Sequence, residues 1–132
     1  MTRDAALAFA RRWVATWNAR DLETMLSFFA DDVVFTSPHA SARIGVPTVT
    51  GKVALRGYWA IALTHIGSLE FVLDHACWDE MRRELAIVYA RRVDGSAVQR
   101  ASELLRFGPD GRIVWGEAFY GAEVPGETTA LA

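Results

Sequence analysis

The sequence predicts an α+β domain in which three N-terminal helices pack on a mostly antiparallel sheet. Apolar residues recur at helical spacing in the first half of the chain, within residues 4–30 and again within residues 52–65. Residues 69–120 instead alternate between apolar and polar or run apolar, with turn residues between the segments. Helices followed by strands that short turns connect are typical of the α+β class.

The first two helices have clear start signals. A helix is expected over residues 4–18, because Thr2 or Asp4 can accept hydrogen bonds from the free amides of its first turn. A second helix is expected over residues 22–30, with Asp21 as its N-cap. Both segments gather their large apolar side chains on one stripe, so each helix should bury one face.

A strand and a long loop separate these helices from the third. Residues 33–36 favour a strand that ends before Pro38. Residues 39–51 hold two glycines, a second proline and no sustained period, which indicates a loop. Helical spacing resumes over residues 52–65, and Gly67 ends that helix.

Four strands are expected in the second half of the chain, over residues 69–78, 85–93, 98–107 and 113–120. The turns between them contain Asp79, Asp94-Gly95 and Pro109-Asp110-Gly111. The last residues contain glycine and proline and have no period. We therefore expect a single domain over residues 1–121 and a loosely ordered tail over residues 122–132.

The composition excludes several classes of protein. The 132 residues are 52% hydrophobic and 23% charged, which is the balance of one soluble domain with a buried core. A net charge of −2 without a basic run argues against a nucleic-acid partner, and no apolar run reaches the roughly 20 residues of a membrane span. Charged residues stand where a signal peptide would be apolar, so a cytoplasmic location is expected. The single cysteine, Cys77, is expected in the core.

The segment around Trp17-Asn18-Ala19-Arg20-Asp21 is the most distinctive part of the chain. It predicts a helix that ends in a bulky aromatic residue, a turn, a second helix and a strand that leads to Pro38. This order resembles the cone-shaped domains of the nuclear transport factor 2-like superfamily, which includes the SnoaL-like proteins, the ketosteroid isomerases and scytalone dehydratase. The resemblance extends to about Gly121 and implies a cystatin-like fold whose curved sheet surrounds a pocket.

The resemblance also allows the catalytic groups of the ketosteroid isomerases to be compared with this sequence. Trp13 occupies the position of their oxyanion-hole tyrosine, and Trp59 that of a supporting tyrosine. Ser37 occupies the position of their aspartate base. Only Glu103, at the position of a protonated aspartate, retains the same functional group, a carboxyl. The resemblance therefore implies a more aromatic pocket with fewer hydrogen-bond donors, and ketosteroid isomerase activity is not expected.

Three residues are candidates for acid–base catalysis. Strand alternation places Glu103 on one face with Ala101 and Leu105, so on the concave face its carboxyl would be desolvated and its pKa raised. His75 interrupts an apolar alternation, and His39 lies with Arg43 in the long loop that could cover the pocket mouth. The alternatives are a carboxyl that only forms hydrogen bonds, a core histidine and a solvated loop histidine.

Candidates for ligand binding are mostly aromatic, although aromatic residues at helical spacing also form ordinary cores. The set comprises Trp13, Trp17, Phe28, Ser37, Tyr58, Trp59 and Tyr120. On the last strand Val114, Gly116, Ala118 and Tyr120 are expected to face the pocket. Leu104, Trp115 and Phe119 should then form an outer apolar patch, which predicts a homodimer through that face.

Two hypotheses about function follow. The first is an enzyme that acts on a small, mostly apolar molecule with a carbonyl, epoxide or hydroxyl group, by isomerisation, cyclisation, dehydration or hydrolysis. No metal or cofactor is expected, because the histidines are scattered and no phosphate-binding glycine motif occurs. The second is a non-catalytic ligand-binding or dimeric interaction domain. Acid–base chemistry requires at least two polar groups within about 3 to 5 Å of one open volume.

Overall fold

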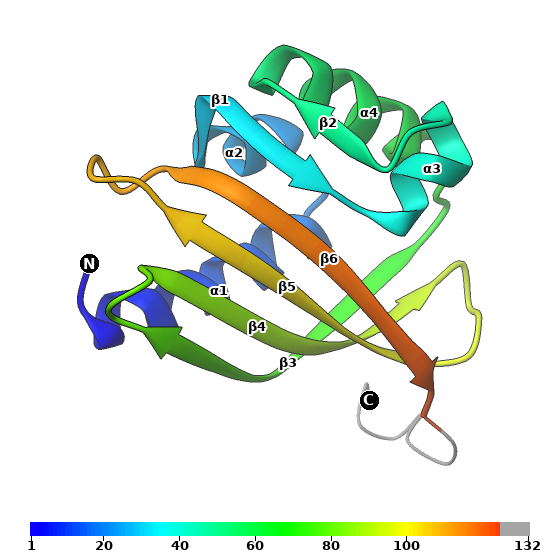
Figure 1. The fold of residues 1–132 in the computed structure, drawn as a ribbon. Helices are drawn as coiled ribbons and strands as arrows, with labels where there is room; N and C mark the ends of the chain where they lie inside the picture. The colour runs from blue at the N-terminus through cyan, green and yellow to red at the C-terminus, as the bar shows by residue number, and fades with distance from the viewer. Residues whose placement is uncertain (125–132) are drawn as a thin grey trace.

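The computed structural model describes residues 1–124, which form four helices and six strands (Figure 1). Their order is α1 (Arg3–Asn18), α2 (Leu22–Ser27), β1 (Phe29–Thr36), α3 (Pro38–Ile44), β2 (Thr48–Thr50), α4 (Lys52–Thr64), β3 (Leu69–Asp79), β4 (Glu84–Val93), β5 (Gln99–Phe107) and β6 (Ile113–Glu123). Within the described residues, no helix combines the length and apolar character needed to cross a membrane.

All six strands form one mixed sheet with the order β2-β1-β6-β5-β4-β3. Only β1 and β6 run parallel, and the other neighbours are antiparallel. The sheet curves, with α1 behind its β3–β5 half and α4 beside β1 and β2 (Figure 1). This architecture confirms the α+β, cystatin-like prediction.

The caps of the first two helices agree with the sequence. The Thr2 hydroxyl accepts a hydrogen bond from the amide of Ala5 at 3.1 Å, and the Asp21 carboxylate accepts one from Thr24 at 3.1 Å. The end of α2, however, was predicted three residues too late. The helix stops at Ser27 because Phe29 already pairs with Ile113 of β6.

The predicted loop over residues 39–51 is wrong in detail, because it contains α3 and β2. Ser37 is the N-cap of α3, Pro38 occupies its first turn and Gly45 ends it with a left-handed φ of 81°. Three residues of β2 then pair antiparallel with the end of β1. These elements hold residues 37–50 against the sheet.

A bulge in β3 changes which side chains face inward. Leu73 pairs with Tyr89 and His75 pairs with Val88, so Asp74 is an extra residue in the strand. The alternation reverses there: Ala76 packs on the core, while Cys77 is exposed. The prediction of a buried Cys77 is therefore wrong.

A similar irregularity lies at the start of β6. Arg106 pairs with Trp115 and Phe107 pairs with Ile113, which leaves Val114 as the extra residue. The buried side chain is consequently that of Ile113 rather than Val114, whereas Gly116 and Ala118 face inward as predicted. The strand continues to Glu123, beyond the predicted domain end at residue 121, and residues 125–132 of the expected tail lie outside the described residues.

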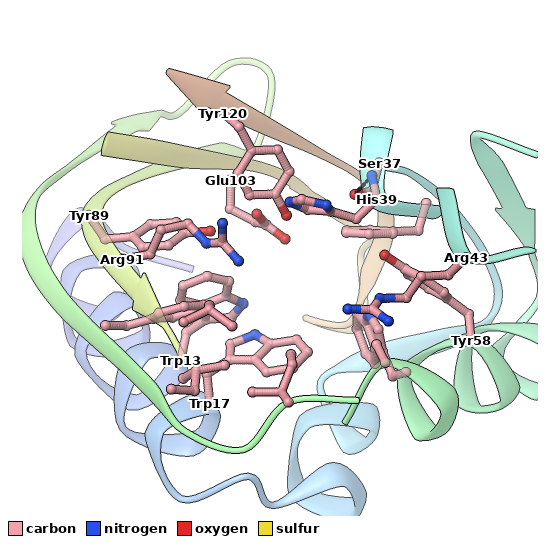
Figure 2. A pocket seen from close by; sticks show the side chains of 17 residues that line it. Trp13, Trp17, Ser37, His39, Arg43, Tyr58, Tyr89, Arg91, Glu103 and Tyr120 are labelled. Atoms are coloured by element: carbon pink, nitrogen blue, oxygen red, sulfur yellow. Dashed lines mark hydrogen bonds between the residues drawn. The ribbon is translucent and has the colours of Figure 1, made fainter. Parts of the chain in front are cut away.

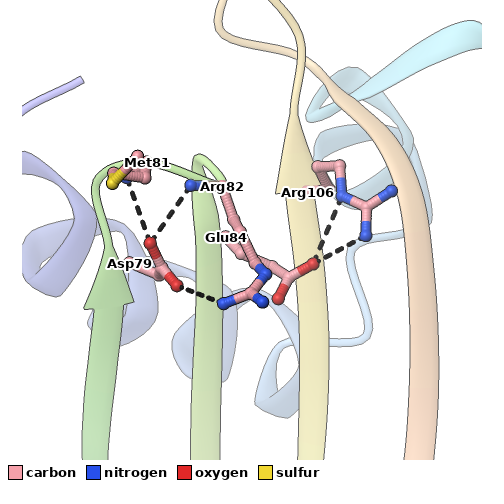
Figure 3. A network of polar contacts seen from close by, with 5 residues as sticks. All are labelled: Asp79, Met81, Arg82, Glu84 and Arg106. Atoms are coloured by element: carbon pink, nitrogen blue, oxygen red, sulfur yellow. Dashed lines mark hydrogen bonds and ion pairs between the residues drawn. The ribbon is translucent and has the colours of Figure 1, made fainter.

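A polar network lies at the end of the sheet where β3 turns into β4 (Figure 3). The Asp79 carboxylate accepts hydrogen bonds from the amides of Met81 and Arg82, at 3.0 and 3.1 Å, and so closes the turn between β3 and β4. Glu84 and Arg106, which face each other across β4 and β5, form an ion pair at 2.8 Å. The Asp79 contacts support the pairing of β3 with β4, and the Glu84–Arg106 ion pair supports the register of β4 with β5.

Candidate functional site

A cavity of about 240 Å³ lies between the helices and the inner face of the sheet (Figure 2). Helices α1 and α4 and strands β1 and β3 provide most of its apolar lining. Strands β4, β5 and β6 and helix α3 provide most of its polar groups. The cavity therefore has an aromatic side and a polar side, which is the usual composition of a site for small organic molecules.

The aromatic side consists of rings that support one another. The rings of Trp17 and Trp59 meet edge to face with centroids 5.2 Å apart. Trp13 stacks on Phe71 at 5.9 Å and contacts Tyr89 at 5.1 Å. Such packing fixes the rings and leaves a preformed apolar surface.

Glu103 is the buried carboxyl of the site. It lies between Ile87 of β4 and Ala118 of β6 in the sheet, and only 5% of it is exposed. Burial raises the pKa of Glu103 to about 8, although the Arg91 charge and a hydrogen-bond interaction with Tyr89 act in the opposite direction. At neutral pH this carboxyl is therefore mostly protonated and can donate a proton.

Arg91 reaches the same space from β4 (Figure 2). One guanidinium nitrogen donates to the side-chain oxygen of Gln99 at 2.9 Å, and the group lies 4.9 Å from the centroid of the Tyr120 ring. Its Nε is buried without a hydrogen-bond partner. Arg91 thus brings a positioned positive charge to the polar side of the cavity.

His39 enters the cavity from the first turn of α3. Its amide donates to the hydroxyl of Ser37 at 3.2 Å, and its ring lies edge to face with that of Tyr120, with centroids 4.2 Å apart. Burial lowers the pKa of His39, and the charges of Arg91 and Arg43 lower it further. The imidazole is therefore neutral at pH 7, and its buried Nε2 has no hydrogen-bond partner.

Three phenols also line the cavity, from three different elements: Tyr58 of α4, Tyr89 of β4 and Tyr120 of β6. Burial raises the pKa of each hydroxyl, so all three remain protonated donors at neutral pH. The expectation of a donor-poor pocket is therefore wrong. The resemblance implied indoles at Trp13 and Trp59 in place of phenols, but Tyr58, Tyr89 and Tyr120 provide phenols from other positions.

Most of the residues predicted for the site lie around this cavity. They are Trp13, Trp17, Ser37, His39, Tyr58, Trp59, Glu103 and Tyr120. Arg43, which the sequence placed near the pocket mouth, lines it from α3. Ser37 is buried, and its hydroxyl caps α3, so it also has a structural role.

The structure places the other two predicted site residues elsewhere. His75 follows the β3 bulge, which turns its side chain outward, where it is 58% exposed and lies 3.1 Å from Asp74. Phe28 caps the end of α2 and packs edge to face on Phe9 at 5.0 Å, away from the cavity lining. Neither side chain contributes to the site.

Sequence reasoning missed Tyr89 and Arg91, although a signal was present. Residues 85, 87, 89 and 91 alternate along β4, and the first three are apolar or aromatic. The same alternation therefore points Arg91 inward. Arginine at an inward position of an otherwise apolar strand was the indication that the pocket contains a charge.

Within residues 1–124, no group of three His, Cys, Asp or Glu side chains has the arrangement of a metal site. The chemistry available in the cavity is that of a buried carboxyl, a neutral imidazole, protonated phenols and guanidinium groups. These groups can bind oxygen atoms and transfer protons.

Fold and cavity together define a SnoaL-like, cystatin-like pocket protein, and sequence comparison agrees. The SnoaL-like domain model matches residues 10–115, so the chain belongs to the SnoaL-like domain family. Among curated proteins, none matches the sequence at a significant level.

Solved structures agree with this assignment. A SnoaL-like protein of unknown function from Burkholderia thailandensis E264 is 32% identical, with a TM-score of 0.81 over 92% of this chain and 98% of its own. A protein with a cystatin-like fold from Methylobium petroleophilum PM1 is 23% identical, with a TM-score of 0.71 over 96% of this chain and 82% of its own. TerC, co-crystallised with polyporic acid, is 19% identical, with a TM-score of 0.71 over 87% of this chain and 91% of its own. The latter two share the fold with this protein.

Proposed function

We propose that the cavity binds a small, mostly apolar molecule with a carbonyl, epoxide or hydroxyl group and exchanges protons with it without a cofactor. The observation that carries this proposal is that Glu103 and His39 both line one open volume. Burial raises the pKa of the carboxyl to about 8, and it lowers the pKa of the imidazole. Two titratable groups whose pKa values are shifted in opposite directions are suited to serve as acid and base.

The roles follow from the protonation states. Glu103, protonated at neutral pH, donates its proton to the oxygen of the bound molecule. The neutral Nε2 of His39 accepts a proton from carbon or from an attacking hydroxyl. The phenols of Tyr89 and Tyr120 donate hydrogen bonds to the oxygen that gains electron density. Isomerisation, cyclisation, dehydration and hydrolysis all use this combination.

Binding without turnover is the alternative. The same aromatic walls and donors would hold a ligand even if no proton moved, and a hydrogen-bonded carboxyl alone does not define an enzyme. TerC, whose structure contains polyporic acid, has the same fold and supports the small-molecule part of the proposal. The two alternatives differ only in what happens after binding.

The deciding experiment is a tryptophan-fluorescence titration with small ketones, epoxides, lactones and phenols, followed by product analysis of every mixture that binds. Trp13, Trp17 and Trp59 line the cavity, so an occupying ligand should quench the emission saturably. Glu103→Gln should weaken binding and abolish turnover. Glu70→Gln, at an exposed position of β3 outside the cavity lining, is the matched control and should behave as wild type.

Each outcome is informative. Saturable binding with turnover that Glu103→Gln abolishes supports the enzyme. Saturable binding with no product from any ligand supports the binding protein. Unchanged emission with the whole panel would contradict the pocket proposal itself.

A second proposal concerns assembly: we infer a homodimer through the outer sheet face formed by Leu104, Trp115 and Phe119. Phe119 is 44% exposed on β6, which is unusual for a phenylalanine without a partner surface. Trp115 lies four residues earlier on the same face of β6, with Glu117 between the two rings and the Arg106 guanidinium 4.9 Å from the Trp115 ring. The patch therefore combines apolar side chains with two charged groups, Glu117 opposite Leu104 and Arg106 beside Trp115.

A further inference from the structure

The charges around the cavity are unbalanced. Two guanidinium groups, Arg43 and Arg91, contribute to its lining, and Glu103 is its single carboxyl. Within residues 1–124, neither arginine forms an ion pair with a carboxylate. Because burial keeps Glu103 largely protonated at pH 7, the cavity carries a net positive charge.

Arg91 is positioned for an external partner. Gln99 orients one of its nitrogens and the Tyr120 ring supports its plane, while the buried Nε has no hydrogen bond. A buried donor without a partner is costly, which favours a ligand that supplies an acceptor. Arg43 is exposed at the cavity mouth and acts through its charge rather than through a fixed contact.

The remaining polar groups are also mainly donors. The indole nitrogen of Trp17 is a donor only, and it is buried without a hydrogen-bond partner. The hydroxyls of Tyr58, Tyr89 and Tyr120 remain protonated, as described above. A cavity with many donors and few free acceptors selects a ligand rich in acceptors.

We infer that the molecule bound here carries a carboxylate on an aromatic or alicyclic body, with the carboxylate on Arg91 and the apolar body against Trp13, Trp17 and Trp59. A guanidinium presents a planar pair of donors that matches a carboxylate, and protonated Glu103 can donate to the same group. The inference rests on the proposed function, since it requires that the cavity binds a small molecule. It deepens that proposal by naming the ligand class.

The test is isothermal titration calorimetry at pH 7 with matched pairs: benzoate, 2-naphthoate and 4-biphenylcarboxylate, each with its methyl ester. Wild type should bind the best acid about tenfold or more tightly than its ester. Arg91→Gln should weaken acid binding about tenfold and leave ester binding unchanged within about twofold. Arg91→Lys should retain part of the preference because it retains the charge.

Arg92→Gln is the control, because Arg92 follows Arg91 on β4 and lies outside the cavity lining. It should bind acids and esters as wild type does. Circular dichroism of each variant identifies any loss of fold, and Arg43→Gln, at an exposed position, provides a second variant. Arg43→Gln should reduce the preference for acids over esters by less than Arg91→Gln does, because solvent and salt screen an exposed charge.

The failures of the two proposals are distinguishable. If wild type binds esters as tightly as acids, or if Arg91→Gln keeps the full preference, the carboxylate inference is overturned and the pocket proposal stands. If neither acids nor esters bind while the neutral ketones, epoxides or lactones do, the ligand class is likewise overturned. If no molecule of either panel binds, both proposals fall.

Discussion

The side-chain amide of Asn18 makes two hydrogen bonds with the backbone of Phe71. Its Nδ2 donates to the carbonyl oxygen at 2.9 Å, and its Oδ1 accepts from the amide at 2.7 Å. These two hydrogen bonds have the donor–acceptor pattern of a neighbouring strand and attach the end of α1 to β3. Two residues later, the Arg20 guanidinium donates to the carbonyl of Ile66 at 2.6 Å. The motif that carries the family resemblance is therefore structural, which explains why it indicates a fold rather than a reaction.

Asn18→Ala should lower the free energy of unfolding by about 1 to 3 kcal/mol, because both Phe71 backbone groups lose their partner. The midpoint of urea denaturation, followed by circular dichroism, measures the change. Glu70→Ala, at the exposed neighbouring position of β3, is the control and should shift the midpoint little. An unchanged midpoint for Asn18→Ala would show that the contact contributes no net stability.

Glu103 should make the protein less stable as the pH rises. Its pKa in the folded state is about 8, above its ordinary value of 4.5, so the folded protein retains a proton that the unfolded chain has lost. The associated stability is fully present below about pH 4.5 and is lost progressively up to about pH 8. Glu103→Gln removes this dependence.

Urea denaturation of wild type and Glu103→Gln from pH 5 to 8.5 tests this prediction. The variant should gain on the order of 3 kcal/mol relative to wild type across that range. The contributions of other titrating groups cancel in the difference, and the curve of Glu70→Gln, an exposed carboxyl of β3, should be parallel to that of wild type. Parallel curves for Glu103→Gln would mean that the carboxyl ionises normally in the folded protein.

Binding of an aromatic carboxylate should weaken above pH 8. Ionised Glu103 would then repel the ligand, so the dissociation constant should rise by up to about tenfold per pH unit. Among the other groups that line the cavity, His39 stays neutral and Tyr58, Tyr89 and Tyr120 stay protonated between pH 7 and 9, because burial lowers the pKa of the imidazole and raises the pKa of each phenol. Arg43 and Arg91 supply the positive charges of the same lining. Calorimetry at pH 7, 8 and 9 measures the change, with the methyl ester as the pH-independent control. Glu103→Gln should abolish the dependence, and a wild-type affinity that stays constant would contradict it.

Phe119→Asp should convert the proposed homodimer to a monomer, because the interface would lose an exposed phenylalanine ring and bury an additional charge. Sedimentation velocity at micromolar concentration distinguishes the two states. Val53→Asp, at an exposed apolar position of α4, is the control and should leave the assembly unchanged. A wild-type protein that sediments as a monomer would remove the proposal.

Periodicity predicted the main elements because it reflects burial directly. α1 and α4 and the four long strands lie where their apolar spacing placed them. α3 was missed because it is too short to show a period, although Ser37-Pro38 and Gly45 are its start and stop signals. The residue order alone did not reveal the extra residues Asp74 and Val114, because a bulge depends on how two strands pair.

The same reasons limited the prediction of the site. Glu103 was found because no bulge separates it from its buried neighbours Ala101 and Leu105. His75 was misplaced because the alternation was extended through the β3 bulge. The lowered pKa of His39 could not be predicted, since it depends first on burial in the cavity and then on the charge of Arg91, which is distant in sequence and approaches His39 only in the fold.

The bulge at Asp74 has a further effect on how copies of this protein behave at high concentration. β3 is a long strand at one end of the sheet, and regular, flat edge strands are templates for uncontrolled association between chains. The extra residue breaks the even spacing of amide and carbonyl groups that an incoming strand would need. Exposed Glu70 and Asp74 add like charges along the same edge. The irregularity that turns His75 away from the cavity therefore also protects the sheet against aggregation.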